Sequence, residues 1–156
     1  LWWVEITSLA HAAFGGGVLL ALRHVGEAMA APLFGSLGDR FGAVKIFTMS
    51  AALTVVGLLL IAFNQVISGA IILLIFRGAI ASLGPTIIAK QFGGTETVLD
   101  NLARLQSWRD IGAAAGPMVT GFALVYISAE IQHLVLAIIF GVVLVLSSPK
   151  ITTNSN

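Results

Sequence analysis

Long apolar runs separated by short polar breaks dominate the chain. Five of these runs are close to the roughly 20 residues that a helix needs to cross the hydrocarbon core of a bilayer. They cover residues 14–37, 45–63, 68–89, 108–127 and 131–146. Because lipid offers no partner to an unpaired backbone group, runs of this kind have to be helical. The pattern predicts an all-α polytopic membrane helix bundle over residues 1–150, followed by a polar C-terminal tail at 151–156.

The longest polar break covers residues 91–107, between the third and fourth runs. Thr95, Glu96, Asp100 and Arg104 are spaced so that polar side chains share one side of a helix. This spacing predicts a short amphipathic helix that lies along the membrane surface.

The composition excludes several classes of protein. Apolar residues make up 58% of the chain and charged residues 10%, against roughly a quarter charged in soluble domains. The mean hydropathy is +1.01. The absence of cysteine excludes a disulfide framework, a cysteine metal site and a thiol nucleophile. A net charge of +1 provides no basic patch for nucleic acid, and no catalytic motif is present, so we expect neither an enzyme nor a cofactor.

Basic residues are distributed unequally between the two sides of the predicted bundle. The loops at residues 64–67 and 128–132 contain no Lys or Arg. Basic residues concentrate in cytoplasmic loops, so the opposite side is expected to be cytoplasmic. We therefore expect an integral multi-pass protein of a bacterial inner membrane with a cytoplasmic C-terminus. The basic residues on that side are Arg40, Lys45, Lys90, Arg104, Arg109 and Lys150.

A short charged turn lies between the first two runs. It resembles the signature loop of the major facilitator superfamily, whose pattern is G-x-L-a-D-r-x-G-r-k. The matching residues are Gly35, Leu37, Asp39, Arg40 and Gly42. The sequence departs from the pattern at Ala43 and Val44, where the family prefers basic residues, and Lys45 is a substitute for them.

The resemblance implies a fold of twelve helices in two six-helix halves, with the signature loop joining the second and third helices of a half. The chain would then supply helices two to six, with residues 1–6 ending the first. The polar tail favours the C-terminal half, whereas the signature loop and a Gly-Pro motif are commoner in the N-terminal half. The expected partners are the lipid bilayer, a small-molecule solute and the missing half of the same transporter.

Three charged residues lie inside the predicted spans, where a charge normally faces a partner or a water-filled cavity. Arg23 and Glu27 are four residues apart and share one helical face, and Arg77 lies at a similar depth in the third span. Either these residues bind substrate or couple transport, or the Arg23–Glu27 pair only fixes helix packing. Glu27 is the one acidic residue deep in a span and hence the candidate for proton coupling. We expect His24 to be a packing residue.

A glycine-proline sequence occupies the fourth predicted span. Gly112 and Gly116 are spaced for a close helix contact, and Pro117 bends a helix by removing a backbone hydrogen bond. The sequence resembles the fifth-helix motif of the family, so it is a candidate gating motif together with the signature loop. Packing without gating is the alternative. Asp110 is expected to favour the start of this helix electrostatically.

Together these features predict a secondary active transporter that moves a small solute by alternating access, with proton coupling through Glu27. The alternative is a non-transporting structural or accessory membrane protein built on a transporter-like half. A ligand-dependent flux would separate the two hypotheses.

Overall fold

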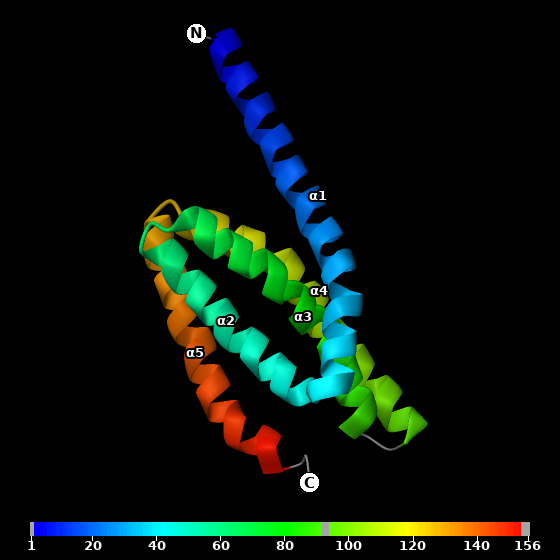
Figure 1. Ribbon diagram of the computed structural model, residues 1–156. Coiled ribbons are helices and arrows are strands. Elements are labelled where there is room, and N and C mark those ends of the chain that lie inside the picture. Colours follow the sequence, from blue (N-terminus) through cyan, green and yellow to red (C-terminus); the bar gives the residue numbers. More distant parts are fainter. Residues whose placement is uncertain (1, 92–93, 154–156) are drawn as a thin grey trace.

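The computed structural model describes residues 2–91 and 94–153, and the side chains of most of them. This part of the chain folds as helices without strands (Figure 1). Their bounds are α1 Trp2–Phe41, α2 Ala43–Ala62, α3 Val66–Gln91, α4 Thr95–Ala123 and α5 Ala129–Thr153. The predicted all-α polytopic bundle is confirmed.

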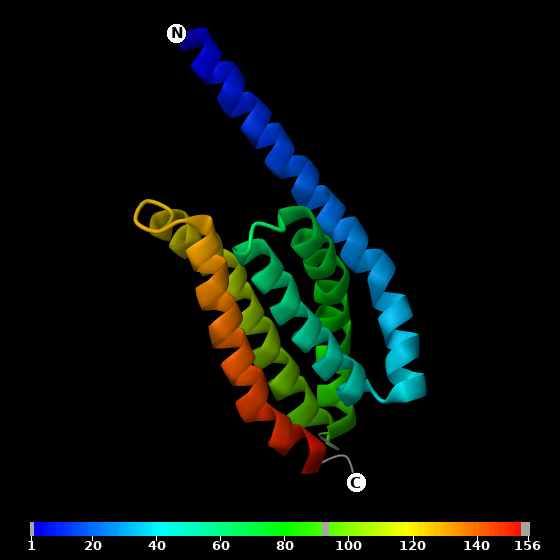
Figure 2. The same ribbon diagram turned by 60° about the vertical axis from the view of Figure 1, so that its left-hand side comes forward.

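The connections between the helices fall at two opposite ends of the bundle. The α1–α2 turn, the end of α3, the start of α4 and the end of α5 lie at one end (Figures 1 and 2). The α2–α3 and α4–α5 connections lie at the other. The basic residues Arg40, Lys45 and Lys90 are at or beside the first end, in agreement with the arrangement from which the cytoplasmic side was predicted.

The first helix is much longer than the predicted span. Residues 14–37 lie within a single helix, α1, that begins at Trp2, so residues 2–6 do not end a separate helix. The glycines at 15–17, beside the start of the predicted span, do not interrupt α1, because each glycine weakens a helix by only about 1 kcal/mol and leaves its hydrogen bonds intact. The N-terminal part of α1 projects beyond the other helices in both views (Figures 1 and 2).

The fourth helix also differs from the prediction. The amphipathic segment at 91–107 and the span at 108–127 are not separate elements, because α4 runs without interruption from Thr95 to Ala123. No glycine or proline occurs between Gly94 and Gly112 to stop it, and the Asp100–Arg104 ion pair at 3.1 Å joins adjacent turns. Asp110 therefore lies near the middle of α4, and its predicted role in the first helical turn is wrong.

Helices α2 and α3 form the centre of the described structure: they pack against each other and against α1, while α4 packs against α3 and α5 against α2. Glycines permit the closest contacts. A Cβ added to Gly69 would lie 2.6 Å from the carbonyl oxygen of Gly57, so α2 and α3 meet backbone to backbone. A Cβ on Gly78 would lie 2.8 Å from that of Ala30, so α1 and α3 are almost as close.

Three helices of the described part are long and apolar enough to cross a membrane: α2, α3 and the Ala129–Ser147 segment of α5. Their outer surfaces carry many exposed apolar side chains, such as Ile71 and Val143. Helix α5 extends to Thr153, past the predicted start of the polar tail, and residues 154–156 lie outside the described residues. The spans within α1 and α4 stay predictions.

Candidate functional site

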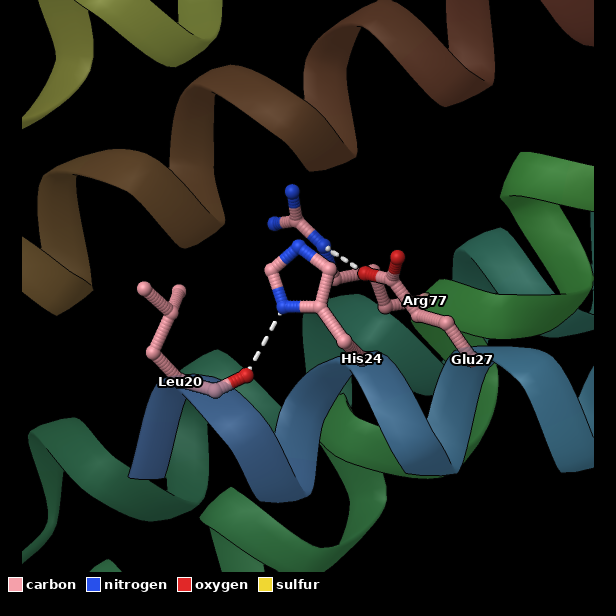
Figure 3. Close-up of polar contacts among 4 residues, drawn as sticks. All are labelled: Leu20, His24, Glu27 and Arg77. Carbon is pink, nitrogen blue, oxygen red and sulfur yellow. Dashed lines mark hydrogen bonds and ion pairs between the residues drawn. The ribbon is translucent and has the colours of Figure 1, made fainter. Parts of the chain in front are cut away.

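An ion pair joins α1 to α3 at positions far from the ends of both helices. Arg77 Nε donates a hydrogen bond to Glu27 Oε1 at 2.7 Å (Figure 3). The Glu27 side chain is 22% exposed and that of Arg77 is 54% exposed. Gly78 makes the pair possible, because α1 approaches so closely there that a Cβ would lie 3.3 Å from the Cα of Glu27. The structure thus brings together two of the three charged residues predicted to form a polar layer.

The third member of that predicted layer is Arg23, whose side chain lies outside the described part of the structure. His24 lies on the same side of α1 as the ion pair (Figure 3), and its Nδ1 is 2.8 Å from the carbonyl oxygen of Leu20. This local contact holds the His24 ring against its own helix. The side chain is exposed, and its predicted packing role stays a prediction.

A second arginine, Arg109, belongs to the same site. The number of residues from Glu27 to the end of α1 equals the number from Arg77 to the end of α3. The same number separates the start of α4 from Arg109. These three helix ends lie at the same end of the bundle (Figure 1). At 1.5 Å per residue the three charges therefore lie at a common depth of roughly 20 Å from that end.

Two cavities meet at Arg77 and Arg109. The first has a volume of about 450 Å³ and is bounded by α2, α3, α4 and α5. The second has a volume of about 500 Å³ and lies along α3 and α4, where Gln106 and Asp110 line it. Gln106 Nε2 donates a hydrogen bond to Asp110 Oδ1 at 2.8 Å, one turn apart on α4.

The sequence analysis missed Arg109 because it ended the polar segment at residue 107 and began a new helix there. In that interpretation Arg109 lay at the cytoplasmic surface. The signal that could have placed it deeper is the lack of any helix-breaking residue between Thr95 and Ile111. A helix that begins at Thr95 carries Arg109 to its middle.

The signature loop forms a turn between α1 and α2. Gly42 adopts φ 93°, a conformation that L side chains rarely take, so a glycine is required where the chain reverses. Asp39 accepts a hydrogen bond from Lys90 Nζ at 3.0 Å, and the Arg40 guanidinium lies 5.3 Å from the Phe41 ring centroid. A Cβ added to Gly35 would meet no atom within 4 Å. The gating role of this loop stays a prediction.

The glycine-proline sequence does not make the predicted contact. Gly112, Gly116 and Pro117 line the second cavity, and a Cβ on either glycine would meet nothing within 4 Å in the described part of the chain. Pro117 lies inside α4, which continues to Ala123. The close helix approach expected at Gly112 and Gly116 is therefore wrong for the described helices, because α4 turns this face toward a cavity. Their gating role stays a prediction.

The described side chains include no group of three or more His, Cys, Asp or Glu residues that could hold a metal ion. The site consists of two arginines, Arg77 and Arg109, with the carboxylates of Glu27 and Asp110 nearby. Such a set can bind charged groups and exchange one ion pair for another.

The comparisons with known proteins gave one match. The family model described as Major Facilitator Superfamily matches residues 4–154. Comparison with curated proteins and with solved structures gave no match.

Proposed function

Because the chain belongs to the major facilitator superfamily, we propose that it forms part of a secondary active transporter that moves a small solute by alternating access. The observation that carries this proposal is the Glu27–Arg77 ion pair, which lies in the interior of two helices and beside cavities. Charges at this depth are costly unless they face a partner or water, and they commonly mark the path of a solute.

A second half of the same transporter would cover the open side of this site. None of the described residues of α4 is buried, and its apolar side chains Ile111, Met118, Val119 and Phe122 are all more than half exposed. An apolar face of this kind marks either a lipid contact or a protein interface. The second cavity opens along the same helix. The solute would bind between this half and its partner.

Glu27 is the residue through which a proton would couple to transport. Its carboxylate contributes the negative charge of the ion pair that joins α1 to α3. Protonation would remove that charge and weaken the link between the two helices. A ligand or proton that binds one conformation better than the other shifts the population toward it. This is the physical basis on which proton binding would drive a change in access.

The proposal can be tested without knowing the solute. The chain contains no cysteine, so a single cysteine introduced into an otherwise cysteine-free full-length protein gives a clean probe. Ala113 is exposed and lines the second cavity. In right-side-out and inside-out vesicles, Ala113→Cys should react with a membrane-impermeant maleimide from both sides. Val143→Cys, on the outer surface of α5, is the control and should react from neither side.

Reaction of Ala113→Cys from one side only, under all conditions, would contradict alternating access. It would favour the non-transporting membrane protein that the sequence left as the alternative. The cytoplasmic position of the α3–α4 connection is tested in the same vesicles by Ala89→Cys, an exposed residue near the end of α3. This cysteine should react only from the cytoplasmic side.

A further inference from the structure

Arg77 and Arg109 line both cavities of the site, and from this arrangement we propose the chemical class of the solute. The solute would be a small organic anion whose carboxylate or phosphate lies between the two guanidinium groups and whose apolar body occupies the first cavity. This inference rests on the proposed function only in taking the bound anion to be the transported solute.

The charges around the first cavity favour an anion. Its described lining residues include both arginines and no acidic residue. The contact with Glu27 runs through Nε of Arg77, whereas a guanidinium carries five N–H donors. Arginine binds carboxylates and phosphates with two parallel hydrogen bonds, so two arginines from adjacent helices form a site that suits an oxyanion.

Arg109 needs a negative partner that the described part of the chain does not supply. The described ion pairs and side-chain hydrogen bonds engage Arg77, Lys90 and Arg104 but not Arg109. Asp110 is its sequence neighbour, but adjacent residues do not face each other on a helix. Asp110 instead accepts a hydrogen bond from Gln106 and lines only the second cavity. The Arg109 side chain is exposed in the described structure and is therefore open to an anion. Once the other half covers this face of α4, an unpaired arginine there would be costly, and a bound anion would stabilise it.

Apart from Thr54, the remaining wall of the first cavity is apolar. Its volume of about 450 Å³ lies within the range of roughly 300–1,000 Å³ usual for small-molecule sites. A fully hydrated anion such as free phosphate would leave the apolar side chains of this wall in contact with water. An anion with a hydrocarbon chain or ring would cover them. The apolar lining residues are Phe47, Leu58, Leu73, Ile80, Leu105 and Phe140.

The test compares three probes with the same cyclohexyl ring: cyclohexanecarboxylate, the neutral cyclohexanecarboxamide and the cation cyclohexylmethylamine. Binding to the purified full-length protein in detergent is measured as the rise in thermal unfolding midpoint over a concentration series. Cyclohexanecarboxylate should bind at least about tenfold more tightly than the amide, and the amine should not bind. Equal shifts from acid and amide, or a larger shift from the amine, would overturn the proposal.

Variants of Arg109 assign the binding to this site. Arg109→Gln should remove the preference for the carboxylate, and Arg109→Glu should transfer it to the amine. Arg104→Gln removes the same charge from the same helix, at a residue outside both cavities, and should leave the preference unchanged. Arg109→Gln should not lower the midpoint of the ligand-free protein. A large fall would show that a carboxylate of the other half already pairs with Arg109, and would overturn the proposal.

Two further outcomes separate the possible failures. An anionic lipid has the same head-group chemistry, so the series is repeated with dioleoylphosphatidylglycerol in the micelle. Loss of the carboxylate shift in its presence would assign the site to lipid and overturn the proposal. Normal two-sided labelling of Ala113→Cys without carboxylate preference would refute the anion but retain the transporter. Carboxylate preference together with one-sided labelling of Ala113→Cys would retain the bound anion but refute alternating access.

Discussion

Asp39 and Lys90 join the ends of α1 and α3 through a hydrogen-bonded ion pair of 3.0 Å. Asp39 belongs to the signature loop, and its partner in the described structure is a lysine on the last turn of α3. Both side chains are more than half exposed, so the pair contributes about 1 kcal/mol or less to stability.

Asp39→Asn and Lys90→Ala should therefore leave the folded yield unchanged but alter the balance between the two access states. A loss of about 1 kcal/mol in one conformer changes that balance roughly fivefold. The ratio of Ala113→Cys labelling from the two sides reports this change. The exchange Asp39→Lys with Lys90→Asp should restore the ratio. An unaltered ratio in both single variants would show that the pair has no part in the cycle.

Gly42→Ala should destabilise the protein by about 1 to 2 kcal/mol, because residue 42 has φ 93° and a Cβ is strained there. The control is Gly35→Ala, a helical glycine with open space around it, which should be neutral or up to about 1 kcal/mol stabilising. Thermal unfolding in detergent compares the two. Equal midpoints would mean that the turn between α1 and α2 relaxes without cost.

Gly78→Leu should greatly reduce the folded yield. Even a Cβ at this position would lie 2.8 Å from the Cβ of Ala30, so a leucine forces α1 away from α3. Overpacking of this kind usually costs about 1 to 3 kcal/mol or more. Gly112→Leu is the matched control, because that glycine faces open space. A normal yield for Gly78→Leu would contradict the close α1–α3 contact.

Gly116→Leu should leave folding intact and impair function. The close helix contact predicted from the sequence would make Gly116→Leu fold less well than Val143→Leu, a substitution on the outer surface of α5. Because Gly116 lines the second cavity and has no near neighbour, the structure predicts equal yields. A leucine would instead fill part of the cavity and slow the labelling of Ala113→Cys. A low yield for Gly116→Leu alone would show that another helix packs on this face.

Glu27→Gln should make the cavity insensitive to pH. Loss of the carboxylate charge removes this ion pair from Arg77. Because the pair is partly exposed, we expect a loss of about 2 kcal/mol in the free energy of unfolding, between the values for surface and buried pairs. The two-sided labelling ratio of Glu27→Gln at neutral pH should match that of the wild type at low pH. The control Glu96→Gln alters an exposed residue in the first turn of α4 and should keep the wild-type pH response.

Arg77→Lys should impair function although it keeps the positive charge, because an ammonium group cannot reproduce the planar contact that a guanidinium makes with a carboxylate. We expect a fall in carboxylate affinity of about tenfold, close to the 1 to 3 kcal/mol typical of a lost charge-assisted hydrogen bond. The same probe series measures it. Unchanged affinity would place the anion away from Arg77.

Hydrophobic runs predicted the all-α polytopic class, because the need for internal backbone hydrogen bonds leaves few other folds. For the pairing of Glu27 with Arg77, the sequence predicted only that the two residues lie at a similar depth in their spans. Its geometry depends on the close approach at Gly78, which no local pattern of α1 reveals. Arg109 was misplaced for a different reason: polarity suggested a surface segment, while the unbroken helical sequence of α4 continued through it.

The contacts of α1 with α3 have a mechanical consequence. The Asp39–Lys90 pair joins the two helices near their ends, the neighbouring Gly38 lies against Leu83, and the Glu27–Arg77 pair joins the helices again far from those ends. While both ion pairs are formed, two contacts at different heights resist sliding and rotation of α1 against α3. Arg109 lies on α4, which neither ion pair joins to α1 or α3. In the proposed transport cycle, the distance between Arg77 and Arg109 would therefore change as the site opens and closes, and an anion bound to both would shorten it.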